Sequence, residues 1–275
     1  MTLDAPREVR TGRSVAEVYD YGAHVWTWAL DGEPVLWTSA GSFFEPGKAL
    51  RGGVPICWPW FGPGRSGDLT PAHGYARISE WTLTGLVEGP DATVLTYTLT
   101  PADAPDALPG ENWTVTYEVS IGDRLQLALT VANQGATPFS YETALHTYFR
   151  VGDVRQVVVG GLDGASYLDK VTGRPEVQAG DVTITAETDR VYLRAGEVVV
   201  TDPVLGRRLR ISTEGAADTV VWNPWIAKAA AMPDFGDDEW PGMLCIEAGN
   251  VLESAVTVMP GSSETLRYAV AVDLT

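Results

Sequence analysis

The sequence predicts an all-β protein, a large antiparallel sandwich or barrel. Three observations support this prediction: apolar and polar residues alternate with a period of two, turn residues interrupt the alternation often, and helical periodicity is nearly absent. In a strand, alternation places one apolar face against a core. Short alternating runs separated by Gly, Asn, Asp and Pro are typical of sandwiches and barrels.

The individual elements follow this pattern along the chain. Residues 24–30 form the first clear strand, and Asp31-Gly32 after them predicts a hairpin turn. Residues 113–119 and 124–131 alternate on either side of a turn at Gly122-Asp123. The other predicted strands are residues 92–100, 155–159, 197–201, 209–212, 219–222 and 266–272.

One short helix and one long loop complete the prediction. Residues 226–232 (Ile-Ala-Lys-Ala-Ala-Ala-Met) can form two helical turns before Pro233, and residues 101–109, rich in Pro, Ala and Asp, predict a surface loop. No repeat, low-complexity tract or linker divides the chain. We therefore predict a single domain over residues 1–275.

Composition excludes several classes of partner. The formal net charge of -17 argues against nucleic acid and anionic membranes. No apolar run approaches the ~20 residues that span a bilayer. The N-terminal residues lack the apolar stretch of a signal peptide, which predicts a cytoplasmic protein.

Metal and cofactor sites are not expected. Cys57 and Cys245 are too few for a disulfide scaffold or a zinc site, and His24, His73 and His146 are widely spaced. Residues 62–67 match G-x-G-x-x-G but lack the strand before and the helix after that a dinucleotide fingerprint needs. The acidic residues 234–239 lack the spacing of a calcium loop, so we predict a solvated acidic loop.

Two arginines frame an unusual segment. Arg51 and Arg77 flank a stretch built from Gly, Pro and Trp in a chain where cations are scarce. Guanidinium groups bind phosphate or carboxylate oxygens with a planar fork, and aromatic rings suit the C–H faces of a sugar. The alternative interpretation is an aromatic loop that fills the core, with two surface arginines.

A histidine and a glutamate lie in apolar, strand-like runs. His146 follows Ala144-Leu145, and Glu247 follows Cys245-Ile246. A lone histidine in such a run is more often a hydrogen-bonded core residue, but a carboxylate there is costly unless it is paired or functional. Together the two side chains would form an acid–base pair.

Six segments stand in a fixed order along the chain. They are Arg51-Gly52-Gly53-Val54-Pro55-Ile56-Cys57-Trp58-Pro59, His73-Gly74-Tyr75-Ala76-Arg77, Ala144-Leu145-His146-Thr147-Tyr148-Phe149, Thr188-Asp189-Arg190-Val191-Tyr192, Val221-Trp222-Asn223-Pro224-Trp225 and the Glu247 run. Any one is weak, but the ordered set, which covers most of the chain from Arg51 to Asn250, resembles the hexose-6-phosphate mutarotases, or glucose-6-phosphate 1-epimerases, of the aldose 1-epimerase superfamily. The resemblance implies a galactose-mutarotase-like β-supersandwich.

The resemblance also implies roles for residues. His146 matches the family's general acid and Glu247 its general base. Arg51 and Arg77 match positions that bind the sugar phosphate, and Asp189 matches a carboxylate that binds sugar hydroxyls.

Three further residues complete the expected sugar site. His73 shares a motif with Arg77 and is expected to contact the substrate. The residue before it, often polar in relatives, is Ala72 here. Trp58 and Trp222 are expected to wall the sugar, although packing alone would also explain either ring.

The implied reaction interconverts the anomers of a hexose 6-phosphate. Glu247 removes the O1 proton, His146 protonates the ring oxygen, and the opened aldehyde recloses on its other face. Because no redox change occurs, no cofactor is expected. Three alternatives stay open: an epimerase of unphosphorylated aldoses, a non-catalytic carbohydrate-binding or sensing sandwich, and a lectin-like or structural sandwich without sugar chemistry.

Overall fold

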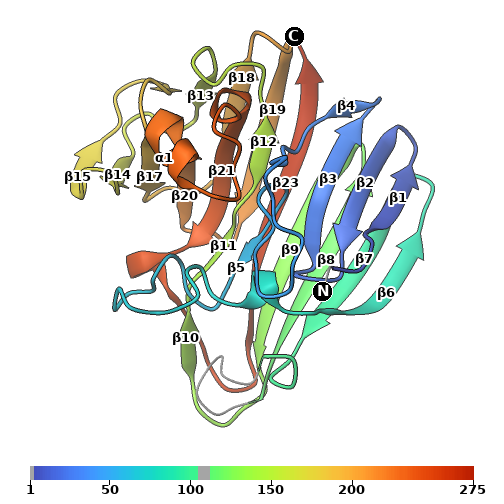
Figure 1. The fold of residues 1–275 in the computed structure, drawn as a ribbon. Helices are drawn as coiled ribbons and strands as arrows, with labels where there is room; N and C mark the ends of the chain where they lie inside the picture. The colour runs from blue at the N-terminus through green and yellow to red at the C-terminus, as the bar shows by residue number, and fades with distance from the viewer. Residues whose placement is uncertain (1–2, 105–111) are drawn as a thin grey trace.

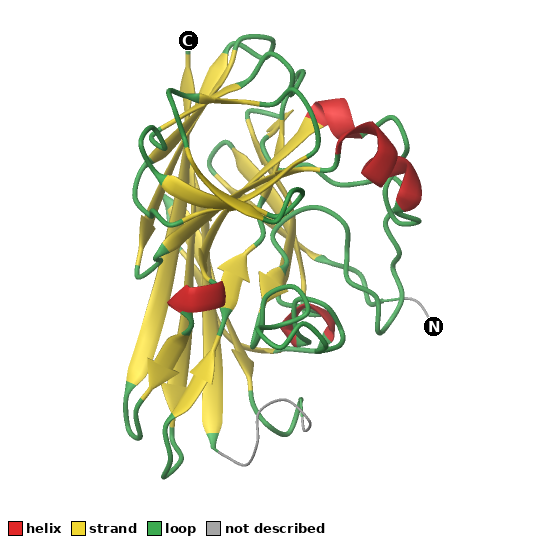
Figure 2. Cartoon of the chain, turned by 90° about the vertical axis from the view of Figure 1, so that its left-hand side faces the viewer, coloured by secondary structure: helices red, strands yellow, loops and turns green. Residues whose placement is uncertain are grey.

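Two large antiparallel sheets stack face to face in this computed structural model, which describes residues 3–104 and 112–275 (Figure 1). Seen from the side, the long strands form one half of the molecule, while loops and the longest helix gather on the other half (Figure 2). The predicted all-β class is therefore confirmed, and the sandwich is the form it takes.

The first sheet has nine strands and provides the long, regular half of the sandwich. In spatial order its strands are β16 (Val182–Thr183), β13 (Val158–Gly160), β18 (Val198–Asp202), β19 (Arg207–Glu214), β23 (Ser263–Leu274), β9 (Arg124–Asn133), β8 (Trp113–Gly122), β7 (Ala92–Leu99) and β6 (Thr82–Glu88).

The second sheet has eight strands, and its central strand, β21, pairs with three others. In spatial order its strands are β15 (Arg174–Val177), β14 (Ser166–Asp169), β17 (Thr188–Tyr192), β20 (Asp218–Asn223), β21 (Met243–Asn250), β11 (Thr143–Leu145) and β5 (Ile56–Cys57), with β12 (Tyr148–Arg150) also on β21.

Two smaller sheets add to the sandwich, and the four-stranded one packs against β7 and β8 of the nine-stranded sheet. A four-stranded sheet contains β1 (Arg7–Thr11), β2 (Ser14–Tyr19), β3 (His24–Leu30) and β4 (Glu33–Pro34), and a two-stranded ribbon contains β10 (Phe139–Tyr141) and β22 (Val256–Val258). The helices are α1 (Trp225–Ala231) and the 3-10 turns η1 (Ala76–Ile78), η2 (Trp240–Gly242) and η3 (Leu252–Ser254). None of the helices in the described ranges has the length and apolar character needed to cross a membrane.

Strand β21 is covered on both faces, one of which lies against the core between the two sheets. Ile246 and Leu244 point into the core between the two sheets, and every residue of the strand is buried. The Tyr268 hydroxyl of the other sheet donates a 2.7 Å hydrogen bond to the Ile246 carbonyl. Burying a side chain such as Ile246 contributes roughly 1.5–3 kcal/mol. Residues that alternate with these therefore point to the opposite face.

Most of the predicted elements are present, with ends that move by a few residues. The predicted helix is α1, and the Asp31-Gly32 turn joins β3 to β4 with both residues at positive φ. The predicted strand at 155–159 starts only at Val158, because Asp153 accepts the Arg155 N–H and holds a turn there. Of the predicted loop at 101–109, residues 101–104 form turns and 105–109 lie outside the described residues.

Candidate active site

A break in one strand places His146 beside Glu247. Strands β11 and β12 both pair with β21, but His146 and Thr147 between them leave the ladder opposite Ile246 and Glu247. The backbone N–H of His146 instead donates to the Pro55 carbonyl at 3.0 Å. As a result, Nε2 of His146 lies 3.3 Å from Oε1 of Glu247.

This pair is buried and incompletely satisfied. In the described part of the chain, Nδ1 of His146 and Oε2 of Glu247 have no hydrogen-bond partner. Unpaired buried polar atoms cost roughly 1–3 kcal/mol each, and folded proteins contain few of them. Such atoms are therefore donors and acceptors available to a bound molecule.

The surroundings shift both pKa values against the charged forms. Burial lowers the pKa of His146 well below its usual value, and the nearby charges of Arg77 and Arg51 lower it further. Burial raises the pKa of Glu247, as does the charge of Asp189. Both shifts favour a neutral pair, with one proton on Glu247, over the protonated His146 and ionised Glu247 expected from the sequence.

The two arginines differ in how they are held. Arg51 donates from Nε and Nη2 to Asp234, with a shortest distance of 2.9 Å, and from Nη1 to the Tyr148 hydroxyl at 2.8 Å. Burial opposes its charge, but Tyr148 and Asp234 outweigh burial and raise the pKa of Arg51. These are four hydrogen bonds from a guanidinium with five N–H donors, so at least one donor on Nη1 is not used by them. Arg51 is thus a cation whose charge is largely offset.

Arg77 has no carboxylate partner among residues 3–104 and 112–275. Its Nη2 donates to the Ala72 carbonyl at 2.6 Å, and its buried Nε has no partner there. Burial lowers the pKa of Arg77, and the charge of Arg51 contributes to that shift. A half-buried guanidinium with open donors is suited to bind an anion.

His73 is oriented by its neighbours as a hydrogen-bond donor. The Gly62 N–H donates to its Nδ1 at 3.3 Å, and Sγ of Cys57 lies 3.3 Å from the same atom. Because a backbone N–H only donates, Nδ1 is the acceptor and the neutral ring carries its proton on Nε2. Burial lowers the pKa of His73 well below its usual value, which maintains this neutral form.

The loop that carries His73 requires an unusual backbone. His73 has φ +65° and Gly74 has φ +73°, both in the left-handed region. A Cβ on Gly74 would lie 2.1 Å from the Trp58 carbonyl oxygen. Glycine is therefore needed for the loop to approach β5, and the His73 and His146 rings come within 5.7 Å of each other.

Asp189, on strand β17, lies between two lysines from other parts of the chain. Its Oδ1 is 3.4 Å from Nζ of Lys170, and its Oδ2 is 3.8 Å from Nζ of Lys228. Lys170 also places its ammonium 4.9 Å from the centre of the Phe61 ring. The site thus has a second cation region beside Asp189, which the sequence did not indicate.

Of the two tryptophans expected to line the sugar site, Trp58 does not line it. Trp58 is fully buried and packs edge-on against Trp113 and Tyr75 in the core between the sheets, because it alternates with Cys57, which faces the site. Trp222 does border the site, with its ring 5.8 Å from that of His146. Tyr148 stacks on His146 with the ring centres 4.8 Å apart and also meets Trp222 edge-on at 5.9 Å, contacts the sequence gave no reason to expect.

The acidic segment 234–239 is only partly solvated, so the prediction of a solvated loop is wrong for two of its members. Asp234 is the partner of Arg51. Glu239 accepts hydrogen bonds from Ser39 Oγ at 2.6 Å and from the Ala40 N–H at 2.9 Å. Asp234 and Glu239 therefore attach this segment to Arg51 and to residues 39–40, while Asp237 and Asp238 are exposed.

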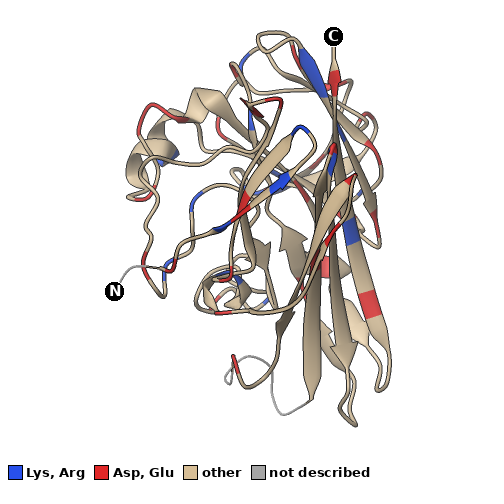
Figure 3. Cartoon of the chain, turned by 90° about the vertical axis from the view of Figure 1, so that its right-hand side faces the viewer, with Lys and Arg blue, Asp and Glu red and all other residues tan. Residues whose placement is uncertain are grey.

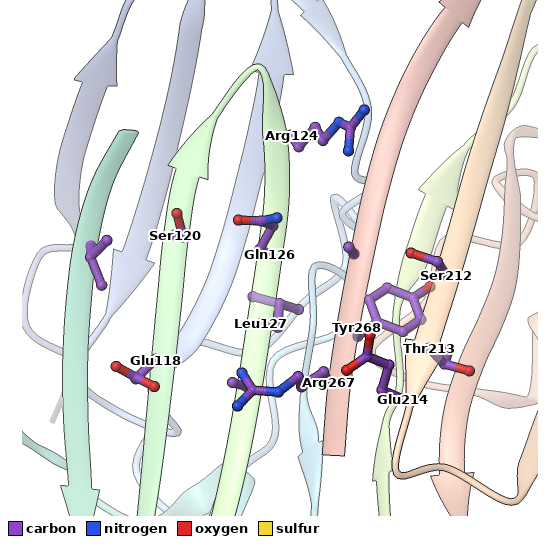
Figure 4. Close-up of a pocket in the computed structure, with 13 residues that line it drawn as sticks. Glu118, Ser120, Arg124, Gln126, Leu127, Ser212, Thr213, Glu214, Arg267 and Tyr268 are labelled. Carbon is purple, nitrogen blue, oxygen red and sulfur yellow. The ribbon is translucent and has the colours of Figure 1, made fainter. Parts of the chain in front are cut away.

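A cavity of about 560 Å³ lies elsewhere, on the outer face of the nine-stranded sheet (Figure 4). Glu118, Arg124, Arg267 and Glu214 project into it from β8, β9, β23 and β19. It contains neither His146 nor Glu247, and its side chains alternate with those that fill the core.

Charged positions of both signs are spread over loops and strands in Figure 3 rather than gathered on one face.

The chain is similar to known proteins along nearly its whole length. A family profile described as aldose 1-epimerase matches residues 8–271. A protein of Cenchrus ciliaris named "Putative glucose-6-phosphate 1-epimerase" is 36% identical over 271 residues, covering 93% of this chain and 80% of the relative. A protein of the same name from Escherichia coli (strain K12) is 37% identical over 237 residues, covering 85% of this chain and 79% of the relative.

Solved structures agree with this similarity. The crystal structure of a "putative mutarotase (YeaD)" from Salmonella typhimurium has a TM-score of 0.90 and 32% identity, covering 98% of this chain and 90% of that one. The galactose 1-epimerase of Lactobacillus acidophilus NCFM has a TM-score of 0.73 and 15% identity, covering 97% of this chain and 93% of that one. The second likeness shows a shared fold, which confirms the mutarotase-like sandwich.

Proposed function

The chain belongs to the aldose 1-epimerase family, and on this premise we propose that it interconverts the α and β anomers of hexose 6-phosphates, glucose 6-phosphate above all. One observation carries the proposal: a buried His146–Glu247 pair with open hydrogen-bonding atoms lies near Arg77, a cation with no carboxylate partner among the described residues. The relatives named as glucose-6-phosphate 1-epimerases support the same substrate.

The reaction uses two proton transfers. Glu247 accepts the proton of the anomeric hydroxyl while His146 donates a proton to the ring oxygen, and the C1–O5 bond breaks to give the aldehyde. Rotation about C1–C2 presents the other carbonyl face. The ring recloses as His146 takes its proton back from O5 and Glu247 returns a proton to O1, so no atom or electron is gained or lost. Each positioned group contributes ~10²–10⁴-fold to the rate.

A bound sugar phosphate changes the charge balance around the pair. A dianion beside Arg77 and Arg51 offsets the two positive charges that lower the pKa of His146. The bound phosphate therefore favours the proton on His146, and the ionised Glu247 is then stabilised as its partner. Because the pair shares one proton in its reactive state, the rate follows a bell-shaped pH profile whose limbs belong to the pair.

The remaining residues orient the sugar ring. The Nε2–H of His73 is positioned as a donor to a sugar oxygen, since Nδ1 is occupied by Gly62 and Cys57. Asp189 accepts hydrogen bonds from sugar hydroxyls, and Trp222 borders the ring beside His146. These contacts hold C1 and O5 against the acid–base pair, which is the positioning that ring opening requires.

Anomer exchange tests the proposal directly. Magnetisation-transfer NMR on glucose 6-phosphate, with glucose as the control, measures exchange between the two anomeric signals. We expect rapid exchange of the phosphate ester, slower exchange of glucose, and loss of both in Glu247→Gln. Equal exchange of glucose and glucose 6-phosphate would identify an epimerase of free aldoses, and no exchange of either would leave a binding protein.

A further inference from the structure

Lys170 has no part in the reaction described above, yet the sheet places it in the site. It follows the last residue of β14, and its backbone N–H donates to the Asp189 carbonyl at 2.8 Å. The β14–β17 register pairs Leu168 with Val191 and Asp169 with Arg190. The next position along this ladder sets Lys170 opposite Asp189.

The register also fixes the face on which Lys170 lies. Asp189 pairs with Trp222 on β20, and Trp222 pairs with Cys245 on β21. Residues directly opposite in an antiparallel sheet point to the same face, as do residues two apart in one strand. Glu247 is two residues from Cys245, so the side chains of Lys170 and Glu247 project from the same face.

The ammonium group of Lys170 is held in place by two contacts. It lies 3.4 Å from Oδ1 of Asp189 and 4.9 Å from the centre of the Phe61 ring, and its side chain is 29% exposed. Lys228 also lies beside Asp189, at 3.8 Å, but it bonds Glu187 at 2.9 Å and is more exposed. The two lysines therefore share a partner but differ in how deeply they enter the site.

Groups of both signs face Glu247 from the elements packed around it. His146 contacts it directly, Asp189 of β17 raises its pKa, and the cations Lys170 and Arg77 lower it. When a phosphate dianion binds Arg77, the positive charge of that arginine is offset. Lys170 then remains as the cation that acts on the carboxylate.

The neutral groups around Glu247 do not replace this charge. Cys57 of β5 and Cys245 of β21 are buried thiols whose pKa values burial raises. Burial also raises the pKa of Tyr148 and lowers that of His73, so both are uncharged at neutral pH.

We propose that Lys170 is a positioning residue for this reaction: its ammonium fixes Asp189 for the sugar hydroxyls and keeps Glu247 ionised while Arg77 binds the phosphate. The inference rests on the proposed role of Glu247 as the base. It assigns to Lys170 an effect on the charge state of the base, which a merely structural ion pair with Asp189 would lack.

Titration of Glu247 in the free protein tests this without any activity measurement. The infrared C=O band of the protonated carboxyl is assigned by its loss in Glu247→Gln and followed with pH. In Lys170→Met, which keeps the methylene stem on Phe61, we expect the midpoint to rise by about one pH unit, the low end for loss of a nearby opposite charge. Lys170→Arg keeps a cation at this position and should leave the Glu247 midpoint close to that of the wild type. The control Lys228→Met should also leave the midpoint unchanged.

Activity gives the second measurement. The pH profile of kcat at saturating glucose 6-phosphate is the suitable one, because the substrate phosphate itself titrates near pH 6 and distorts kcat/KM. We expect the acid limb to move up by about one pH unit in Lys170→Met and to stay in place in Lys228→Met. Removing a cation raises the pKa of the base, so the carboxylate forms only at higher pH.

Two outcomes overturn the inference. An unmoved infrared midpoint in Lys170→Met shows that Lys170 does not control Glu247, and an equal shift in Lys228→Met shows only an effect of overall charge. Failure of the proposed function looks different, because the wild-type protein then exchanges no anomers while the infrared titration still reports the coupling of Lys170 to Glu247.

Discussion

Replacing Arg77 with alanine tests where the substrate phosphate binds. Arg77 has an open guanidinium, whereas the charge of Arg51 is offset by Asp234 and Tyr148. From the sequence, both arginines were expected to bind the phosphate. Because the ion pair offsets the charge of Arg51, we expect Arg77 to bind the phosphate more strongly and the effects of removing the two arginines to be unequal.

The size of the effect follows from the contacts. A hydrogen bond to a charged group contributes roughly 1.5–3 kcal/mol, and 1.4 kcal/mol corresponds to about tenfold in affinity. We therefore expect Arg77→Ala to raise KM for glucose 6-phosphate about ten- to a hundredfold. Arg51→Ala alone would leave Asp234 as an unpaired anion beside the phosphate. The double variant Arg51→Ala/Asp234→Asn removes the pair without changing net charge, and we expect it to raise KM less.

The assay compares two substrates. Anomer exchange is measured on glucose 6-phosphate and on glucose for each variant, and Arg77→Ala should affect only the phosphorylated sugar at the pH optimum. Arg77→Lys should recover part of the loss, because an ammonium lacks the planar fork. If Arg77→Ala slows exchange of both sugars equally, Arg77 supports the fold, and the assignment of the phosphate site is refuted.

Four further predictions follow from the same site. Glu247→Gln and His146→Asn should each lower kcat at least a hundredfold, and the double variant should be little worse, because the two act as a unit; additive losses in kcat would separate their roles. Tyr148→Phe keeps the ring stacked on His146 but loses the Arg51 hydrogen bond, so KM for glucose 6-phosphate should rise about two- to tenfold with kcat retained; a kcat loss as large as that of His146→Asn would contradict this. With glucose as substrate, Arg77→Ala should move the basic limb of the pH profile upward, because loss of that charge raises the pKa values of both His146 and Glu247; a downward shift would refute the electrostatic argument. EDTA should leave exchange rates unchanged, because both proton transfers are assigned to side chains, and a loss that zinc or calcium restores would oppose the assignment.

Strand periodicity predicted much of the fold, and its errors have local causes. Long alternating runs such as β7 and β8 were located because one face is buried and the other is not. Strand β14 is only four residues long and was missed. Since Lys170 gains its place from the β14 ladder, the sequence gave no signal for it until that strand was known.

The structure brings together most of the expected site residues, but not their partners. His73, His146 and Glu247 come together as the motifs implied. The partner of Arg51 is Asp234, which lies 183 residues away in a segment expected to face solvent. Long-range pairing of this kind depends on the packing of the loops and has no local period. The prediction for Trp58 failed because successive residues of an extended chain point to opposite faces: Cys57 faces the site, so Trp58 points into the core.

The distribution of charge bears on how so acidic a chain would bind the proposed dianionic substrate. The net charge of -17 repels a sugar phosphate at long range, but this repulsion is screened beyond ~8–10 Å at physiological salt. Within that distance the local groups decide: Asp234 offsets Arg51, Asp189 offsets Lys170, and Arg77 remains unpaired among the described residues. The end of the site at Arg77 therefore carries the surplus positive charge, while near Glu247 the cation of Lys170 is paired with Asp189. This arrangement favours substrates whose anionic group lies away from the reacting carbon, as the C6 phosphate does.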